Sequence, residues 1–360
     1  MRFPKKTLSL LVGALIVFSV ATGSFSTAFA AEKKSFKIAW SIYVGWMPWG
    51  YAADNGIVKK WADKYGIDIK VVQFNDYVES INQYTAGSFD ADVMTNMDAL
   101  TIPAAGGVDS TALILGDFSN GNDAVILKGK DKLVDIKGQN VNLVELSVSH
   151  YLLARALESV GLAEKDIKVV NTSDADIVAA YATDDVTAVV TWNPLVAEIL
   201  AMPGANKVFD SAWVPGEIID MLVVKTAVVK DNPKFAKALV GAWFETMALM
   251  SRDNAEGKAA REAMGNASGT DLAGYEMQLA STKMFYAAKD SLAFAKSANL
   301  PAIMDKVRKF SFDHGLLGNG APSPDVVGMV FPGGRTLGDT GNIKLRFDDT
   351  FVGMAVKGAL

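Results

Sequence analysis

The stretch INQYTAGSFDADVMTNMDAL, residues 81–100, contains the pattern that decides the fold. Its first residues belong to a segment, 76–86, that is typical of a helix, and a glycine follows where that helix should end. The short apolar run at residues 91–95 fits a buried strand, and polar residues follow it before the next apolar segment. A buried strand flanked by helices is the repeating unit of an α/β fold.

The same alternation extends along the chain in both directions from this stretch. Further strands are predicted at residues 36–40, 67–74, 111–115, 124–127, 141–144, 167–170, 187–191 and 221–224. Further helices are predicted at residues 50–65, 147–160, 175–183 and 194–200. Strands separated by helices form parallel sheets with crossover connections, and the length of the chain favours two such lobes.

Two polar loops that lead into short β-rich runs are the predicted crossings between the lobes. They lie near residues 123–127 and 220–224. The first lobe is then expected to comprise residues 31–125 and 223–360, and the second lobe residues 126–222. A solute would bind between the lobes, at loops that leave the carboxyl ends of the strands.

The C-terminal part follows a different pattern, with long helices and no strand of comparable strength after Lys225. Helices are predicted at residues 233–251, 272–284, 290–298 and 301–314. The last stretch, 322–360, is rich in Gly, Pro and Asp and fits either an ordered tail packed on a lobe or a partly mobile one.

The composition argues against several classes of function. The 35 Lys and Arg are outnumbered by 40 Asp and Glu, so no basic face for nucleic acid is expected. Without cysteine the chain has no disulfide framework. Because His150 and His314 are its only histidines, the sequence offers few residues for a Ser-His-Asp triad or for a metal centre built from histidines. We expect neither a cofactor nor a metal.

Residues 1–30 have the features of a cleavable secretory signal. Basic residues at the start are followed by an apolar run, residues 8–20, and by the small-residue cleavage pattern Ala28-Phe29-Ala30. The run is shorter than the ~20 residues that span a bilayer. We therefore expect a mature protein that begins at Ala31 and is released into the periplasm, with no lipid anchor because no cysteine follows the signal.

Four groups of residues resemble motifs of the nitrate/sulfonate/taurine-type substrate-binding proteins of ABC transporters. They are the segment 42–49 with Gly56 and Lys59, the segment 83–99, the segment 117–123, and Thr191-Trp192-Asn193-Pro194. The resemblance covers about residues 36–230, and the nearest members are those associated with urea or guanidine carboxylases. It implies a type II periplasmic-binding-protein fold with a closing cleft, and a monomer that delivers a small solute to an inner-membrane permease with its ATPase.

One difference from the family concerns Glu145. Members that bind oxyanions use the amino end of the second lobe's first helix, where the helix dipole favours negative charge. Here Val144-Glu145-Leu146-Ser147 occupies that place, so the carboxylate is expected to repel sulfonate or nitrate and to attract a cation or a solute rich in N–H groups. The alternative is that Glu145 caps the helix or points to solvent.

Further candidate ligand-binding residues follow predicted strands. Asp98 and Asn96 follow the strand at 91–95, and Asp123 and Asp220 lie at the predicted crossings. Their alternative roles are local, because Asn and Asp commonly cap helices and Asp123 could be only a hinge hydrogen-bonder. The aromatic candidates are Tyr43, Trp46, Trp192 and Trp213, which are near strand ends and could instead belong to the core.

Carboxylates and aromatic faces together suit guanidinium, because carboxylates accept charge-assisted hydrogen bonds from planar N–H groups and ring faces attract cations. The sequence leaves open urea or an amide, and a taurine-like sulfonate or nitrate with Arg155 or Lys225 at the ligand. An exported amide hydrolase is disfavoured, because no G-x-S-x-G elbow or other nucleophile motif is present.

Overall fold

The computed structural model describes residues 33–318 and 320–360, and Lys33–Leu360 forms one compact unit. The predicted secretory signal at residues 1–30 lies outside the described residues. Among the helices that are described, none is both long enough and apolar enough to cross a membrane.

The larger of two sheets has nine strands within the described residues, in the order β13-β12-β14-β4-β10-β3-β1-β2, and β11 pairs with β4. Its strands are β1 (Ser35–Ser41), β2 (Asp68–Phe74), β3 (Ala91–Thr95), β4 (Ser110–Ser119), β10 (Ile219–Lys225), β11 (Thr282–Met284), β12 (Gly328–Val330), β13 (Thr336–Leu337) and β14 (Ile343–Phe347). Strand β1 is parallel to β2 and β3, whereas β10 is antiparallel to β3 and β4. We call this sheet and the helices packed on it the first lobe.

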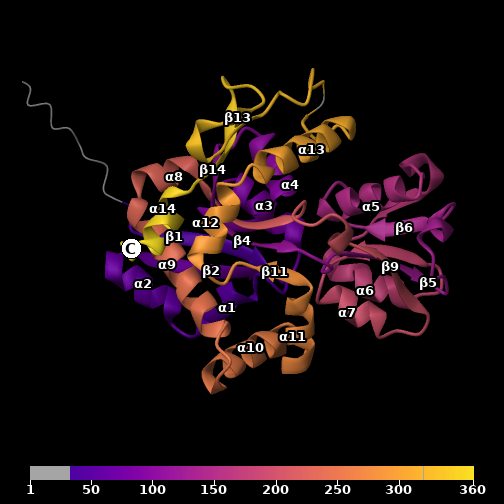
Figure 1. The fold of residues 1–360 in the computed structure, drawn as a ribbon, viewed down its shortest axis with the longest axis horizontal. Helices are drawn as coiled ribbons and strands as arrows, with labels where there is room; N and C mark the ends of the chain where they lie inside the picture. Colours follow the sequence, from indigo (N-terminus) through magenta and orange to yellow (C-terminus); the bar gives the residue numbers. More distant parts are fainter. Residues whose placement is uncertain (1–32, 319) are drawn as a thin grey trace, which may run out of the picture. The chain divides into compact units, whose positions relative to one another are not determined.

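Helices cover the larger sheet (Figure 1). They are α1 (Met47–Asp54), α2 (Ile57–Tyr65), α3 (Tyr77–Thr85), α4 (Asn96–Ala99), α8 (Thr226–Asp231), α9 (Pro233–Met250), α10 (Ala255–Ala267), α11 (Leu272–Ala280), α12 (Ala288–Ala295), α13 (Asn299–Asp313) and α14 (Thr350–Val356). A π-helical turn, η1 (Leu100–Ala104), continues α4. Side-chain caps fix where two of these helices begin: Asp76 accepts the Glu79 N–H at 2.8 Å, and Thr95 accepts the Asp98 N–H at 3.3 Å.

The smaller sheet has five strands in the order β7-β6-β8-β5-β9. They are β5 (Ala124–Lys128), β6 (Asn140–Leu143), β7 (Lys168–Asn171), β8 (Ala188–Thr191) and β9 (Ala205–Asp210). The accompanying helices are α5 (Val148–Ser159), α6 (Asp174–Ala182) and α7 (Leu195–Leu200), with short 3-10 turns η2 (Leu133–Ile136), η3 (Glu164–Asp166) and η4 (Ser211–Trp213). This group is the second lobe.

The side chains of strand β5 alternate between the two faces of the smaller sheet. Ala124 and Ile126 pack in one apolar cluster with Ile177 of α6, whereas Val125 packs in another with Leu152 of α5. Because successive side chains of a strand point to opposite faces, the two clusters lie on opposite sides of the sheet. In Figure 1, α5 accordingly lies on one side of this sheet, with α6 and α7 on the other. The predicted two-lobed α/β fold is confirmed.

Two neighbouring segments join the sheets, one from β4 to β5 and one from β9 to β10. Hydroxyl groups connect them, because Ser211 Oγ lies 2.6 Å from Ser119 Oγ and accepts the Gly121 N–H at 2.7 Å. The Ser211 N–H donates to the Asp123 carbonyl oxygen at 2.9 Å. We call these segments the crossings; the predicted lobe limits at residues 126 and 222 stay predictions.

The C-terminal part contains the predicted helices, except that the helix predicted at residues 272–284 ends at Ala280 and residues 282–284 form β11. It also contains further strands that the sequence pattern did not indicate. Helices α9 to α13 occupy most of residues 233–313, whereas β12, β13 and β14 add three strands to the larger sheet. Strand β14 is parallel to β4 and therefore anchors the tail in the first lobe. These strands have two to five residues in a segment rich in Gly and Asp, too short for a two-residue repeat to be recognised.

Candidate functional site

A small cavity lies between the lobes beside the crossings. The residues that line it are Tyr43, Trp46, Tyr77, Thr95, Asp123, Val148, Trp192, Ile218 and Asp220. They come from the segment between β1 and α1, the start of α3, the end of β3, the residues at the starts of β5, α5 and β10, and the residue after β8. About 10 Å³ is open to the centre of a water-sized molecule, which is close to the minimum that one water needs. The closed cavity therefore suits only a very small solute.

Four aromatic side chains form a continuous series around the cavity. The ring centroids of Tyr43 and Trp46 are 5.0 Å apart, those of Trp46 and Tyr77 are 5.4 Å apart, and those of Tyr77 and Trp192 are 5.7 Å apart. All four are buried, and Trp192 Nε1 donates to the Ile42 carbonyl oxygen at 3.3 Å, which joins the second lobe to the first. The series gives the cavity aromatic faces that attract a cation.

Three buried carboxylates, Asp117, Asp123 and Asp220, lie at the crossings. Asp117 and Asp220 are opposite each other in the antiparallel pair of β4 and β10, and the Tyr43 hydroxyl donates to Asp117 Oδ1 at 3.0 Å. Asp117 Oδ2 and Asp220 Oδ2 are buried without a hydrogen-bond partner within the described residues. Like charges at opposed positions of a sheet repel, so this pair needs either a proton shared between the two carboxyl groups or a counter-charge.

The protonation of these groups reflects burial and the charge of their neighbours. Burial raises the pKa of Asp123 to about 7, although a hydrogen bond from Ser119 lowers it. Burial also raises the pKa of Asp220 well above its usual value, and the negative charges of Asp117 and Asp123 raise it further. The charged groups that raise these values are other carboxylates, so the cavity is a region of concentrated negative potential once its acids ionise.

Asp98 places a fourth carboxylate next to the cavity. Its Oδ2 accepts hydrogen bonds from the Tyr77 hydroxyl at 2.7 Å and the Thr95 hydroxyl at 2.8 Å, and both donors line the cavity. Burial raises its pKa to about 6, and the backbone N–H of Val148 is among the groups that lower it. Val148 is the first residue of α5, so the carboxylate at the amino end of this helix is that of Asp98.

Five of the predicted site residues line the cavity: Tyr43, Trp46, Trp192, Asp123 and Asp220. Three others lie elsewhere. Asn96 is buried and fixes the crossing from β9 to β10. Its amide donates to the Glu217 carbonyl oxygen at 3.1 Å and accepts the Ile219 N–H at 3.0 Å. Glu145 is exposed in the loop before α5, and Trp213 is 75% exposed against Phe209. The ligand roles of all these residues, and of Asp98, stay predictions.

Sequence reasoning did not identify Tyr77, Thr95, Val148 or Ile218 as lining residues. Tyr77 is the first residue of α3, and its position directly after a helix-capping Asp indicated a helix start, not a cavity. Asp117 was noted only as part of the family-like segment 117–123, because its position opposite Asp220 is set by the register of two strands that are distant in sequence. For these lining residues the sequence offered only the alternation of strands and polar loops, which does not show which loops meet at the cavity.

Glu217, in the loop before β10, is buried in an ionic cluster. It accepts hydrogen bonds from Lys306 Nζ and the Tyr151 hydroxyl at 2.6 Å each, and from Arg155 Nε at 3.0 Å. Although burial raises the pKa of Glu217, these three donors lower it below its usual value. Because Tyr151 and Arg155 belong to α5 and Lys306 to α13, the cluster connects the two lobes.

The two basic residues considered for an anion are both away from the cavity. Arg155 pairs with Glu217 and Glu158, and the ammonium group of Lys225 lies 5.5 Å from the Tyr84 ring at the far end of β10. Among the described residues, no Lys, Arg or His lines the cavity. The cavity is therefore small and is lined by acidic and aromatic side chains.

Comparison with known proteins gives a family and a fold. The model of the NMT1-like family matches residues 30–264. A protein of Brucella abortus (strain 2308) that is named as a binding protein is 26% identical over 182 residues, which are 49% of this chain and 56% of that protein. The taurine-binding periplasmic protein of Escherichia coli (strain K12) is 25% identical over 130 residues, 35% of this chain and 40% of that protein. The chain thus spans about half the length of the curated relatives it matches.

The fold is also found in solved structures. The alkanesulfonate-binding protein of Xanthomonas axonopodis pv. citri, bound to MOPS, matches with a TM-score of 0.66 at 18% sequence identity. The match covers 81% of this chain and 96% of that protein. The predicted periplasmic-binding-protein fold with two lobes is confirmed.

Proposed function

Because the chain belongs to the NMT1-like family, we propose that it is the solute-binding protein of an ABC importer and that its solute is guanidinium. The observation that carries the proposal is the cavity between the lobes, where Asp123 and Asp220 line a small space bounded by four aromatic rings. The solute would be captured in the periplasm by a monomer and delivered to a membrane permease with its ATPase.

The charge of the cavity supports a cation. Burying an ionised carboxylate without a partner is so unfavourable that the group either stays protonated or takes up a counter-ion. Here Asp117 and Asp220 face each other, Asp123 lies close enough to raise the pKa of both, and the described cavity lining contains no basic side chain. A bound cation would supply the counter-charge and favour ionisation of these acids.

The lining of the cavity supports a small planar cation. Guanidinium presents N–H donors around its edge, which match carboxylates such as Asp123 and Asp220, and it presents two flat faces for aromatic rings. A ring face beneath a cation contributes roughly 0.5 to 2 kcal/mol, more when the pair is desolvated. Because the closed cavity holds little more than one water, the lobes must part slightly to hold guanidinium, and larger solutes would require them to remain further apart.

A neutral solute such as urea is the second candidate, and one observation favours it. Burial raises the pKa of Asp123 to about 7 and that of Asp98 to about 6, so part of the acid cluster is protonated near neutral pH. A protonated carboxyl group can donate a hydrogen bond to a carbonyl oxygen and still accept one from an amide N–H. Urea has the same planar outline as guanidinium without its charge.

Sulfonate or nitrate is a third candidate, because relatives and structures with this fold are named for taurine and alkanesulfonates. An anion would need the amino end of α5 or a basic side chain. Asp98 places its own carboxylate beside Val148 at that helix end, and Arg155 is bound to Glu217. These contacts favour a cation over an anion.

The test is a titration of the purified chain, by calorimetry at pH 8, with guanidinium chloride, urea, taurine and nitrate. Potassium chloride at equal ionic strength is the control for the salt of the guanidinium sample. We expect guanidinium to bind most tightly, and at 100 times its dissociation constant to add about 2.7 kcal/mol to the free energy of unfolding. Tighter binding of taurine or nitrate would refute the charge argument, and tighter binding of urea would select the neutral solute.

A further inference from the structure

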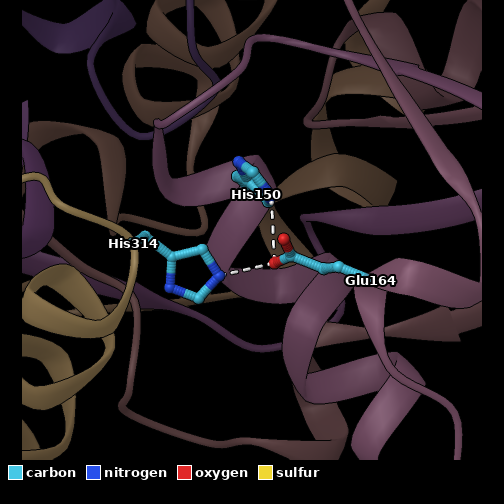
Figure 2. A group of neighbouring side chains, drawn as sticks. All are labelled: His150, Glu164 and His314. Carbon is cyan, nitrogen blue, oxygen red and sulfur yellow. Dashed lines mark hydrogen bonds and ion pairs between the residues drawn. The ribbon is translucent and has the colours of Figure 1, made fainter.

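Both histidines of the chain lie in one cluster with Glu164, away from the cavity (Figure 2). His150 belongs to α5 and Glu164 to the turn η3, both in the second lobe, whereas His314 directly follows α13. In Figure 2 the two rings and the carboxylate converge on one point. The cluster therefore joins segments 150 residues apart in sequence.

The ring of His314 is held in the orientation that a metal ligand needs. Its Nδ1 lies 2.8 Å from the Phe310 carbonyl oxygen, and the ring stacks on Phe310 with centroids 3.9 Å apart. A carbonyl acceptor fixes the proton on Nδ1, and metal-binding histidines are usually held in this way. The proton that Nε2 shares with Glu164 must leave when a metal binds there. Nε2 points toward Glu164 Oε1 at 2.6 Å.

His150 supplies the second, independent observation. Its side chain is 4% exposed, and Nε2 lies 3.1 Å from Glu164 Oε1. Because Nδ1 accepts the Leu146 N–H, Nε2 carries the ring proton and faces the Glu164 carboxylate, although not in good hydrogen-bond geometry. An ion that replaces this proton would hold the buried Nε2 and the carboxylate together.

We propose that His150, Glu164 and His314 form a binding site for a divalent transition-metal ion of the zinc type. Two imidazole nitrogens and one carboxylate oxygen are a ligand set that Zn²⁺ accepts, with water in the fourth position. The side chains of Glu164 and His314 are 33% and 21% exposed, so an ion and a water molecule can reach the cluster from solvent. This inference is independent of the solute that the cavity binds.

The distances require only small side-chain movements. The three ligand atoms all lie within 4.8 Å of one another. Bonds of about 2.0 to 2.2 Å in tetrahedral geometry place ligand atoms roughly 3.3 Å apart. The 3.1 Å from His150 Nε2 to Glu164 Oε1 already fits, whereas the 2.6 Å from His314 Nε2 must widen as an ion enters.

One hydrogen bond opposes the site and limits its affinity. The Leu146 N–H donates to His150 Nδ1 at 3.1 Å, whereas a metal on Nε2 requires a proton on Nδ1. The Leu146 N–H must therefore turn toward water, which is feasible because Leu146 is 43% exposed and its backbone has the unfavourable φ of 63°. Losing one such bond weakens metal binding by roughly tenfold, which a three-ligand zinc site can tolerate.

The first test uses the full chain without a histidine tag, freed of metal by dialysis against a chelator. Zn²⁺ is titrated in competition with a chromophoric chelator, and Co²⁺ serves as an optical probe of tetrahedral coordination. We expect one ion per chain, and binding at least tenfold weaker in Glu164→Gln and His314→Ala. The matched control is Glu158→Gln, an exposed glutamate of α5 outside the cluster. Absence of binding, or equal binding in the cluster variants, would overturn the proposal.

The second test distinguishes a metal from a proton. Because the chain has two histidines, its ¹⁵N-imidazole spectrum contains few signals and each can be assigned with the variants. We expect Zn²⁺ to shift the Nε2 resonances of both His150 and His314 at constant pH. A spectrum that changes with pH but not with Zn²⁺ would show that the cluster binds only protons.

Discussion

The sharpest test of the cavity is the exchange of Asp123 for asparagine. This change removes the negative charge and keeps nearly the same shape, in a side chain that is 3% exposed and lines the cavity. A hydrogen bond to a charged group contributes about 1.5 to 3 kcal/mol when it is desolvated. Asp123→Asn should therefore weaken guanidinium binding by about 10-fold to 150-fold.

The assay is calorimetric titration at pH 8, above the pKa of about 7 that burial gives Asp123, so that the wild-type carboxylate is largely ionised. Urea is titrated in parallel, and its affinity should change far less because it carries no charge. The matched control is Asp92→Asn: Asp92 is also buried and burial also raises its pKa, but its side chain lies near Ser80 at 3.4 Å and does not line the cavity. Unchanged guanidinium affinity in Asp123→Asn, or an equal loss for urea, would refute the charge argument.

The remaining predictions concern the effect of pH, the roles of Glu145 and Glu217, and the effect of Zn²⁺. Guanidinium affinity should fall by up to about tenfold per pH unit below 7 for each linked acid, because protons compete with the cation at Asp123; calorimetry from pH 8 to pH 6 measures this. The ligand-free chain should unfold at a higher temperature at pH 5.5 than at pH 7.5, because stability from acids with raised pKa values is fully present below their unfolded pKa and is lost as pH rises through the folded pKa near 7. Glu145→Gln should hardly change guanidinium binding, because Glu145 is exposed and does not line the cavity. A loss of affinity as large as that of Asp123→Asn would instead place Glu145 in contact with the solute. Glu217→Gln should lower the free energy of unfolding by about 1 to 3 kcal/mol in denaturant titration, because Arg155 and Lys306 lose their shared carboxylate. Zn²⁺ should tighten guanidinium binding, and guanidinium should tighten Zn²⁺ binding by the same factor, if the cluster joins the lobes only when they close.

The fold could be predicted from the sequence because it depends on local pattern. The buried run at residues 91–95 lies between helices with recognisable ends, and the structure places a strand and two helices there. Polar residues at strand ends could be predicted in the same way, which is why Asp123, Asp220 and Tyr43 were identified before their positions were known. In α/β folds the ends of strands meet at one edge, so position in the pattern already indicates the site.

The details of the site depend on contacts that no local pattern contains. The sequence places Glu145 two residues before the cap of α5, but the carboxylate beside the first N–H of this helix is that of Asp98, from a different lobe. Asp117 becomes the neighbour of Asp220 only through the register of β4 and β10, which are separated by about one hundred residues. Both contacts follow from how the lobes and strands pack, and burial, together with neighbouring charges and hydrogen bonds, then sets the protonation of the acids.

On the proposed function, the acid cluster also connects binding to closure. When the lobes are apart, water can solvate Asp123 and Asp220, so their charges are tolerated. Closure around the aromatic rings removes that water, and the carboxylates must then take up either protons or a cation. Above the pKa of about 7 that burial gives Asp123, this group is largely ionised, so a cation of the right size would stabilise the closed lobes. A neutral or anionic solute of equal size offers no such stabilisation, and the charges buried at the crossings would then select the solute through the energy of closure itself.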